Sequence, residues 1–253
     1  MSVKEIIFSP TGGTKAVADI LAKSLDEVPF TIDLANRFAD HEQIALAAED
    51  VAIIALPCYC GRVPVLAAER LSHIRGNGAR AVLVAVYGNR AYDDELVELI
   101  DLATDCGFKP VAAVEAVAEH SIVRQYAAGR PDALDAANLQ KIARRIAEKL
   151  AADDTSAPAV PGNRPYKEGP CGGYLPRASK ACVHCGQCAE ACPAGAIDLT
   201  QLETADASRC ISCMRCIAIC PVNARAIDPS QQQGIAAHLR EACSVRKEAA
   251  LHL

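Results

Sequence analysis

The first 150 residues alternate between short apolar runs and segments whose apolar side chains recur every three or four residues. Apolar runs of strand length predict β-strands, and the helical spacing predicts amphipathic helices between them. Strands that are apolar throughout are typical of a parallel sheet covered by helices on both faces. We therefore predict a doubly wound five-stranded parallel α/β domain over residues 1–152. Its strands are expected at residues 3–8, 30–34, 51–56, 81–87 and 111–117.

The loop after the first strand has the composition of a phosphate site. It reads Ser9-Pro-Thr-Gly-Gly-Thr14 and leads directly into a predicted helix. The N–H groups at a helix N-terminus bind anions, glycine lets the backbone approach, and hydroxyls donate to phosphate oxygens. The loop is neither a Walker A nor a G-x-G-x-x-G motif. On its own, an ordinary strand–helix turn capped by Thr11 explains it equally well.

Two further loops, at 57–62 and 87–93, follow the third and fourth strands and are expected at the same sheet edge, where ligands of such folds bind. Together the three loops resemble the flavodoxin family, in which they hold the FMN phosphate and flank the flavin ring. Gly13 stands where flavodoxins often have Asn, and Trp, common in the family, is absent. The resemblance implies FMN bound by Ser9, Thr11, Gly12, Gly13, Thr14, Pro57, Cys58, Tyr59, Cys60, Gly61, Tyr87, Gly88, Asn89, Arg90 and Tyr92.

Two cysteine runs near the C-terminus share the spacing C-x2-C-x2-C-x3-C-P. This is the bacterial two-cluster iron–sulfur pattern, in which the fourth cysteine of each run serves the other cluster. A zinc ribbon has only four ligands, and disulfides are typical of secreted chains, so both alternatives fit less well. We predict two [4Fe–4S] clusters, one held by Cys182, Cys185, Cys188 and Cys220 and the other by Cys192, Cys210, Cys213 and Cys216.

The cysteine runs divide the second half of the chain. Residues 178–230 resemble the two-cluster bacterial ferredoxins, small α+β domains in which the clusters replace much of the hydrophobic core. Residues 153–177 are rich in Pro and Gly and predict a semi-rigid linker. Apolar positions from Ile235 onward predict a C-terminal helix within 231–253 that docks on one of the domains.

Composition narrows the class of protein. The 253 residues carry thirteen cysteines and a formal net charge of −5, which favours metal or redox use and disfavours nucleic-acid binding. The N-terminus lacks a signal-peptide pattern and no segment is long and apolar enough to span a membrane, so we expect a cytoplasmic protein. The expected partner is a redox protein: a ferredoxin, a flavodoxin or an oxidoreductase. The sequence does not determine the oligomeric state.

Several other residues deserve two interpretations. Cys58 and Cys60 form a redox-active thiol pair or, as we prefer, are small loop residues beside the flavin. His120 delivers a proton to a substrate or is simply a polar strand end, and the second is preferred. Arg90, Arg124 and Arg130 line the mouth of the flavin site or are solvated. We interpret the spare cysteines as structural; they are Cys106, Cys171 and Cys243.

Taken together, the chain resembles the flavodoxin–ferredoxin fusion proteins of anaerobes, called EFR1-type ferredoxins. This resemblance implies electron transfer between the clusters and FMN on behalf of a partner protein. The alternative is an FMN-dependent reductase that delivers ferredoxin-type electrons to an organic substrate, with His120 as the proton donor. A flavin covered by Tyr59 and Tyr87 would favour the carrier, whereas a deep open pocket would favour the reductase.

Overall fold

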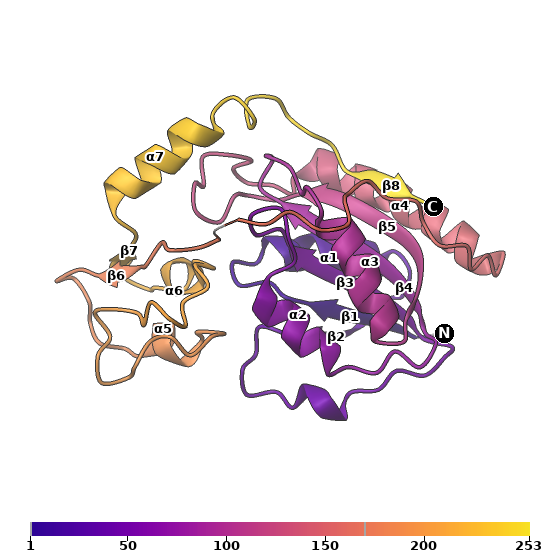
Figure 1. The fold of residues 1–253 in the computed structure, drawn as a ribbon, viewed down its shortest axis with the longest axis horizontal. Coiled ribbons are helices and arrows are strands. Elements are labelled where there is room, and N and C mark those ends of the chain that lie inside the picture. Colours follow the sequence, from indigo (N-terminus) through magenta and orange to yellow (C-terminus); the bar gives the residue numbers. More distant parts are fainter. Residues whose placement is uncertain (1, 170) are drawn as a thin grey trace.

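A central six-stranded sheet organises the larger part of the molecule (Figure 1). The computed structural model describes residues 2–169 and 171–253. Five strands run parallel in the order β2-β1-β3-β4-β5, which is the flavodoxin-like doubly wound order. The predicted fold class is thus confirmed. The strands are β1 (Val3–Ile7), β2 (Phe30–Asp33), β3 (Val51–Pro57), β4 (Arg80–Tyr87), β5 (Lys109–Val117) and β8 (Ala250–His252).

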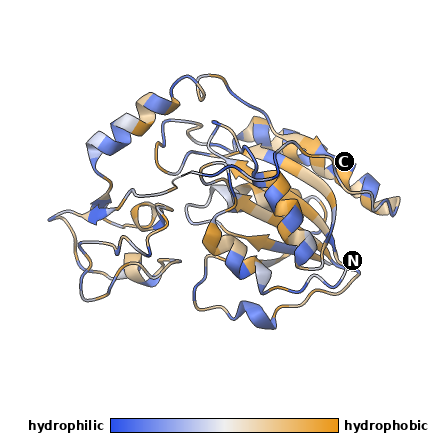
Figure 2. Cartoon of the chain, viewed as in Figure 1, coloured by the Kyte–Doolittle hydropathy of each residue, from blue (hydrophilic) through white to orange (hydrophobic). Residues whose placement is uncertain are grey.

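Helices cover both faces of this sheet because its strands are apolar on both sides. On one face, α1 (Gly13–Lys23) and α4 (Ala133–Ala151) enclose one core cluster. On the other, α2 (Val65–Ser72) and α3 (Glu95–Asp105) enclose a second. A short 3-10 helix, η1 (His41–Gln43), lies between β2 and β3. Figure 2 shows the hydrophobic residues concentrated in these central strands.

The cysteine-rich segment forms a separate small lobe at one end of the molecule (Figure 1). It holds two short helices and one antiparallel pair of two-residue strands. These elements are β6 (Arg177–Ala178), α5 (Gln187–Glu190), α6 (Arg215–Ala218) and β7 (Arg225–Ala226). Its buried apolar cluster has only four members, Ala189, Ile197, Leu202 and Cys216. So small a core needs additional cross-links to be stable on its own.

The Pro/Gly-rich segment crosses the surface of α3, and its described residues, 153–169 and 171–176, form no helix or strand before β6. The carboxylate of Asp94 accepts the backbone N–H groups of Asn163 (2.8 Å) and Lys167 (2.6 Å). Arg164 pairs with Asp101 at 2.6 Å, and this contact holds the pKa of Asp101 below its ordinary value. The segment is therefore attached along α3 and does not hang free in solvent.

The C-terminus differs from the predicted helix. Helix α7 covers Pro229–Leu239, and the chain then returns to the sheet as β8, antiparallel to β5. Asn89 directs this return because its amide nitrogen donates to the carbonyls of Cys243 (3.1 Å) and Val245 (2.9 Å), and its oxygen accepts from Lys247 N–H (3.1 Å). Pairing with β8 covers the edge of β5 that would otherwise stay open.

Candidate functional site

The loop after β1 has the geometry of an anion site. Gly12 adopts a left-handed conformation (φ 94°), and no heavy atom lies within 4 Å of the position its Cβ would occupy. The Ser9 hydroxyl accepts the N–H of Lys15 at 2.9 Å, which leaves its own proton available for a ligand. The first N–H groups of α1 have no acceptor within the helix. These features fit the phosphate of FMN, whose site the sequence predicts here.

Gly13, which departs from the flavodoxin pattern, is explained by packing. A Cβ at this position would lie 2.9 Å from the Cβ of Ala118, which follows β5. This is closer than side chains normally pack, so an Asn would require the loop or the strand end to move. The glycine is therefore set by packing.

The loop after β3 is closed by a tight turn. Tyr59 and Arg62 exchange backbone hydrogen bonds (3.0 and 3.1 Å), and Cys60 and Gly61 between them both have positive φ. This is the type I′ pattern, which places Cys60 at the exposed tip. A Cβ at Gly61 would lie 2.4 Å from the Asp93 carboxylate, so the turn packs directly against the loop after β4.

The three predicted ring aromatics lie apart in two groups. Tyr87 and Tyr92 pack together with their ring centroids 5.5 Å apart, and burial raises the pKa of Tyr87 to about 12. Tyr59 instead faces the cysteine-rich lobe. Its pKa is raised well above the ordinary value by burial and, secondarily, by the charge of the neighbouring Cys213. Tyr59 therefore lies apart from the Tyr87–Tyr92 pair.

The loop after β4 is occupied by the C-terminal segment to a degree that the sequence did not indicate. The carbonyl of Asn89 accepts the ammonium of Lys247, and the carbonyl of Gly88 accepts the thiol of Cys243. Asn89 itself is buried. Residues 243–247 thus pack beside the predicted flavin loops. The sequence did not indicate this contact, because these residues lie more than 150 positions after Asn89.

His120 follows β5 and is half-buried against Gly88. Its Nδ1 accepts the backbone N–H groups of Ile122 (3.2 Å) and Val123 (3.1 Å). Burial lowers the pKa of His120 below its ordinary value. The ring is therefore neutral at pH 7 with its proton on Nε2, a weak acid for proton delivery.

The three candidate arginines at the mouth take different roles. Arg90 pairs with Asp93, and Arg124 lies exposed beside Glu119. Arg130 is buried and pairs with Asp135, with Nε–Oδ2 at 2.8 Å. The expectation that all three line one opening or are solvated is wrong for Arg130.

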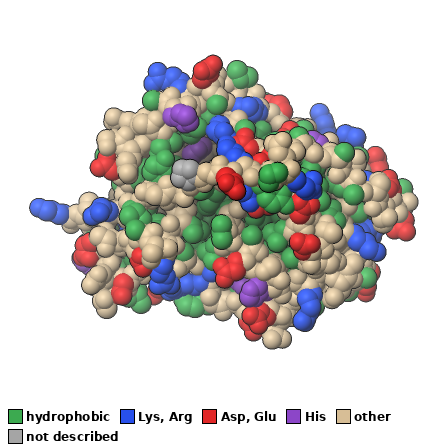
Figure 3. All heavy atoms as spheres, in the orientation of Figure 1, with side chains coloured by type: hydrophobic (Ala, Val, Ile, Leu, Met, Phe, Trp, Pro, Cys, Tyr) green, Lys and Arg blue, Asp and Glu red, His purple; other side chains and the backbone are tan. Residues whose placement is uncertain are grey.

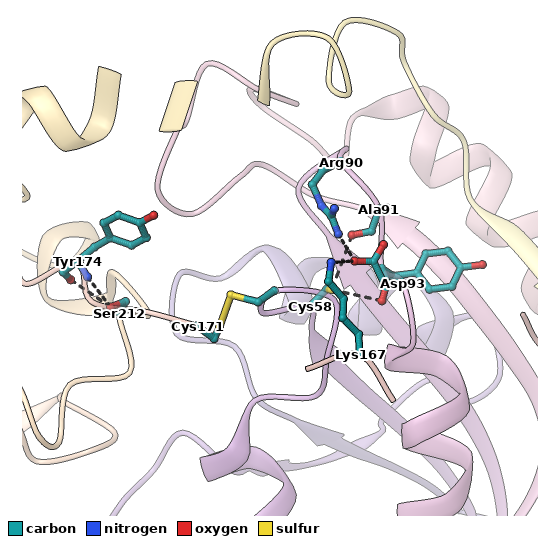
Figure 4. The surroundings of a disulfide bond; sticks show 10 residues. Cys58, Arg90, Ala91, Asp93, Lys167, Cys171, Tyr174 and Ser212 are labelled. Atoms are coloured by element: carbon teal, nitrogen blue, oxygen red, sulfur yellow. Dashed lines mark hydrogen bonds and ion pairs between the residues drawn. A yellow bond between two sulfur atoms is a disulfide. The ribbon is translucent and has the colours of Figure 1, made fainter. Parts of the chain in front are cut away.

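Cys58 and Cys60 do not pair with each other. The Cys58 thiol lies 3.6 Å from the Tyr92 carbonyl and is held protonated, because burial and the nearby Glu95 raise its pKa well above the ordinary value. Cys60 forms a disulfide with Cys171 of the Pro/Gly-rich segment (Figure 4). The sequence interpretation of Cys60 as a small loop residue and of Cys171 as a spare cysteine missed this bond, because 111 residues separate the two.

The eight cysteines of the two motifs line two cavities. The first cysteine cavity is lined by Cys182, Cys185, Cys188 and Cys220. The second cysteine cavity is lined by Cys192, Cys210, Cys213 and Cys216. Among the described residues, no three His, Cys, Asp or Glu side chains converge closely enough to hold a single metal ion. Both linings are otherwise largely apolar, as the sites of polynuclear thiolate clusters require.

The two cysteine loops share one conformation, repeated after 28 residues. Left-handed residues occur at His184, Gly186 and Gly195 in the first loop. They recur at Ser212, Met214 and Asn223 in the second. In each loop a backbone N–H donates to the last cysteine, Ala196 to Cys192 Sγ (3.3 Å) and Ala224 to Cys220 Sγ (3.2 Å). Hydrogen bonds of this kind stabilise a ligating thiolate and fit an iron–sulfur site.

The second cysteine cavity is the one that contacts the α/β domain. Arg70 of α2 donates to the carbonyl of Pro193 at 2.7 Å, and Ile211 packs against the core between the sheet and α2–α3. Cys192, Cys213 and Cys216 are buried, whereas Cys185 of the first cavity is exposed. One cavity therefore lies against the flavodoxin-like domain while the other is open to solvent.

The surface shows no single-sign patch on the face drawn in Figure 3, where acidic and basic side chains are interspersed. Within the described ranges, no helix combines the length and apolarity needed to cross a bilayer.

Comparison with known proteins separates the two halves of the chain. Residues 181–224 match the family described as 4Fe-4S dicluster domain. A flavodoxin from Streptococcus pneumonia TIGR4 is 21% identical over 59% of this chain and 99% of its own, with a TM-score of 0.41. Flavodoxin 1 from Bacillus cereus is 13% identical over 58% of this chain and 98% of its own, with a TM-score of 0.42. No curated protein matches.

A larger structural neighbour is rubredoxin oxygen:oxidoreductase from Desulfovibrio gigas. It is 18% identical, with a TM-score of 0.43, and the match covers 61% of this chain but 37% of that enzyme. The strand order and the family match together describe the chain as a flavodoxin-like fold joined to a segment that matches a 4Fe-4S dicluster domain.

Proposed function

We propose that this protein transfers electrons between two [4Fe–4S] clusters and one FMN on behalf of a partner redox protein. The first cysteine cavity would hold one cluster and the second the other. FMN would be held by the Ser9–Thr14 loop and flanked by the loops at 57–62 and 87–92. When bound, the clusters supply one-electron transfer at low potential, and the flavin exchanges one electron or two.

One observation carries the proposal: the second cysteine cavity lies against the α/β domain. The disulfide from Cys60 of the 57–62 loop leads to the segment in which Tyr174 exchanges hydrogen bonds with Ser212, next to Cys213. Arg70 and Ile211 hold the same side of the lobe against the α/β domain. These contacts support the proposed order of the three sites, with the exposed first cavity outermost and the flavin loops innermost.

The reductase alternative needs a proton donor over the flavin. His120 was the sequence candidate, yet its Nδ1 accepts two backbone N–H groups and its pKa is lowered. A neutral imidazole donates a proton poorly at pH 7. This observation favours the electron carrier.

The test is an anaerobic redox titration of the reconstituted protein, with iron, sulfide and flavin measured first. We expect two clusters of four irons and one FMN per chain, and a flavin that is reduced in two separated one-electron steps. A single two-electron step would support the reductase, and absence of bound flavin would contradict the proposal.

The order of the sites is tested by Cys216→Ser, which removes one ligand of the second cavity. Electrons that enter at the exposed cluster should then reach the flavin much more slowly. Cys106→Ser is the matched control, since Cys106 lies under α2 with its thiol 3.5 Å from the Leu71 carbonyl and outside both cavities. Equal flavin reduction rates in the two variants would refute the proposed order.

A further inference from the structure

The disulfide between Cys60 and Cys171 joins the loop after β3 to the Pro/Gly-rich segment (Figure 4). Its Cα atoms are 5.7 Å apart, within the usual range for disulfides. Both cysteines are exposed. Cys60 lies at the tip of the turn after β3, and Cys171 lies in the segment that leads into the cysteine-rich lobe.

The Cys171 end of the disulfide adjoins the loop of the second cavity. A Cβ at Gly172, next to Cys171, would lie 3.3 Å from the Ser212 hydroxyl, and Ser212 immediately precedes Cys213. The N–H of Tyr174 donates to the same hydroxyl at 3.1 Å. The disulfide therefore lies beside the loop that carries a proposed cluster ligand.

Hydrogen bonds also hold the linking segment on both sides of the disulfide. On one side the segment is attached where the Asp94 carboxylate accepts the N–H of Lys167. On the other it is attached where Tyr174 and Ser212 exchange hydrogen bonds (3.1 and 3.2 Å). Exposed disulfides are, as a class, the ones that are reduced and exchanged most easily.

Cys58 does not offer an alternative partner inside the loop. Its thiol points to the carbonyls of Ala91 and Tyr92, and its burial keeps it protonated. Because the thiolate is the attacking form, Cys58 is a poor nucleophile toward the disulfide. Once reduced, Cys60 and Cys171 would remain as an exposed dithiol.

We propose that Cys60–Cys171 is a redox-active disulfide that is reduced by electrons from the second [4Fe–4S] cluster. Two electrons arrive one at a time and two protons come from water; the S–S bond breaks and two thiols form. The exposed dithiol is then able to reduce a disulfide on another protein. The electron source rests on the proposed function, whereas the disulfide itself does not.

The test labels thiols in the holoprotein under anaerobic conditions. Peptide mapping of the oxidised protein should first show Cys60 linked to Cys171. The clusters are then reduced photochemically, and a maleimide is added. We expect one new label at each of the two cysteines. In protein stripped of its clusters, the same illumination should leave both unlabelled.

Variants sharpen the result. Cys60→Ser and Cys171→Ser should gain no label on reduction, since the remaining cysteine is free throughout, and Cys106→Ser should behave like the parent chain. If a serine variant fails to assemble its clusters, the comparison of holoprotein with cluster-free protein decides alone.

Three outcomes would overturn the proposal. They are an oxidised chain without the link, clusters that bleach while both cysteines stay unlabelled, and equal labelling with and without clusters. Failure of the proposed function looks different, because cluster absorbance would then be missing before any labelling begins.

Discussion

Arg225 is a buried cation placed between the two cysteine cavities, and its removal should change the potential of the first cluster. Its side chain is buried, and Nη1 lies 3.4 Å from Cys188 Sγ in the first cavity. Nη2 donates to the carbonyl of Pro176, which lines the second cavity, at 3.1 Å. Arg225→Met keeps a flexible, unbranched side chain and removes the charge.

The magnitude follows from the Nη1–Sγ distance. Two unit charges 3.4 Å apart interact by about 5 kcal/mol at an effective dielectric constant of about 20, and by about 1 kcal/mol at about 80. For a one-electron couple, about 1.4 kcal/mol corresponds to about 59 mV. The cation favours the reduced, more negative cluster, so its loss should lower the potential by about 50 to 200 mV.

The assay is a potentiometric titration followed by EPR, performed after the iron and sulfide content has been measured. That control is needed because the variant also loses the donor to the carbonyls of Leu202 and Pro176. Arg225→Lys retains the charge and should shift the potential much less than Arg225→Met. The reasoning would be refuted by a fully loaded Arg225→Met protein whose first cluster keeps its potential or becomes easier to reduce.

Three further changes test other parts of the structure. Gly13→Ala places a methyl group 2.9 Å from Ala118 and should weaken FMN binding by about 1–3 kcal/mol in a fluorescence titration; unchanged affinity would contradict the packing argument. Asn89→Ala removes three hydrogen bonds to residues 243–247, each worth about 0.5–1.5 kcal/mol. Amide exchange in β8 should therefore become faster, and unaltered exchange would show that β8 is held by other contacts. Glu95 is buried without a hydrogen-bond partner for either oxygen in the described part of the chain, and burial raises its pKa well above 4.5. In this range the native Glu95 stays protonated while the unfolded chain ionises, which favours the unfolded state as pH rises. The gain in unfolding free energy from Glu95→Gln should therefore grow as pH rises from about 4.5 to 7; a gain independent of pH would sink this explanation.

The sequence predicted those features that are encoded locally. Five apolar runs of strand length, separated by helical spacing, identify the parallel sheet because each run must be buried on both faces. The cysteine spacing is equally local, since it places three thiols of one loop around a single cavity. The strand–loop–helix layout around residues 9–14 was predictable for the same reason, since strand, glycines and helix are contiguous; phosphate binding by this loop stays a prediction.

The features that sequence analysis missed depend on residues far apart in the chain. Residues 250–252 have no strand signal of their own, and they pair with β5 because Asn89 and Arg130 hold the preceding segment. From the sequence, Gly13 suggested only a missing side-chain hydrogen bond. The structure gives a packing reason, because a Cβ at this position would meet the Cβ of Ala118. The Cys60–Cys171 bond has no local signal, because a single cysteine in a turn carries no information about its partner.

These contacts between residues far apart in the sequence join the two halves of the chain into one structural unit. Asn163 attaches the Pro/Gly-rich segment to α3, and Tyr174 attaches it to the loop of the second cavity. Helix α7 leads away from the lobe and contacts the 120–126 loop, where the amide of Gln232 donates to the Ile122 carbonyl at 2.9 Å. Two independent connections therefore hold the lobe at the carboxyl edge of the sheet. A diffusing ferredoxin would have to find this orientation at each encounter, at an entropic cost that the fused chain avoids. The positions of these contacts, and not the cysteine motifs alone, then determine which cysteine cavity lies against the α/β domain.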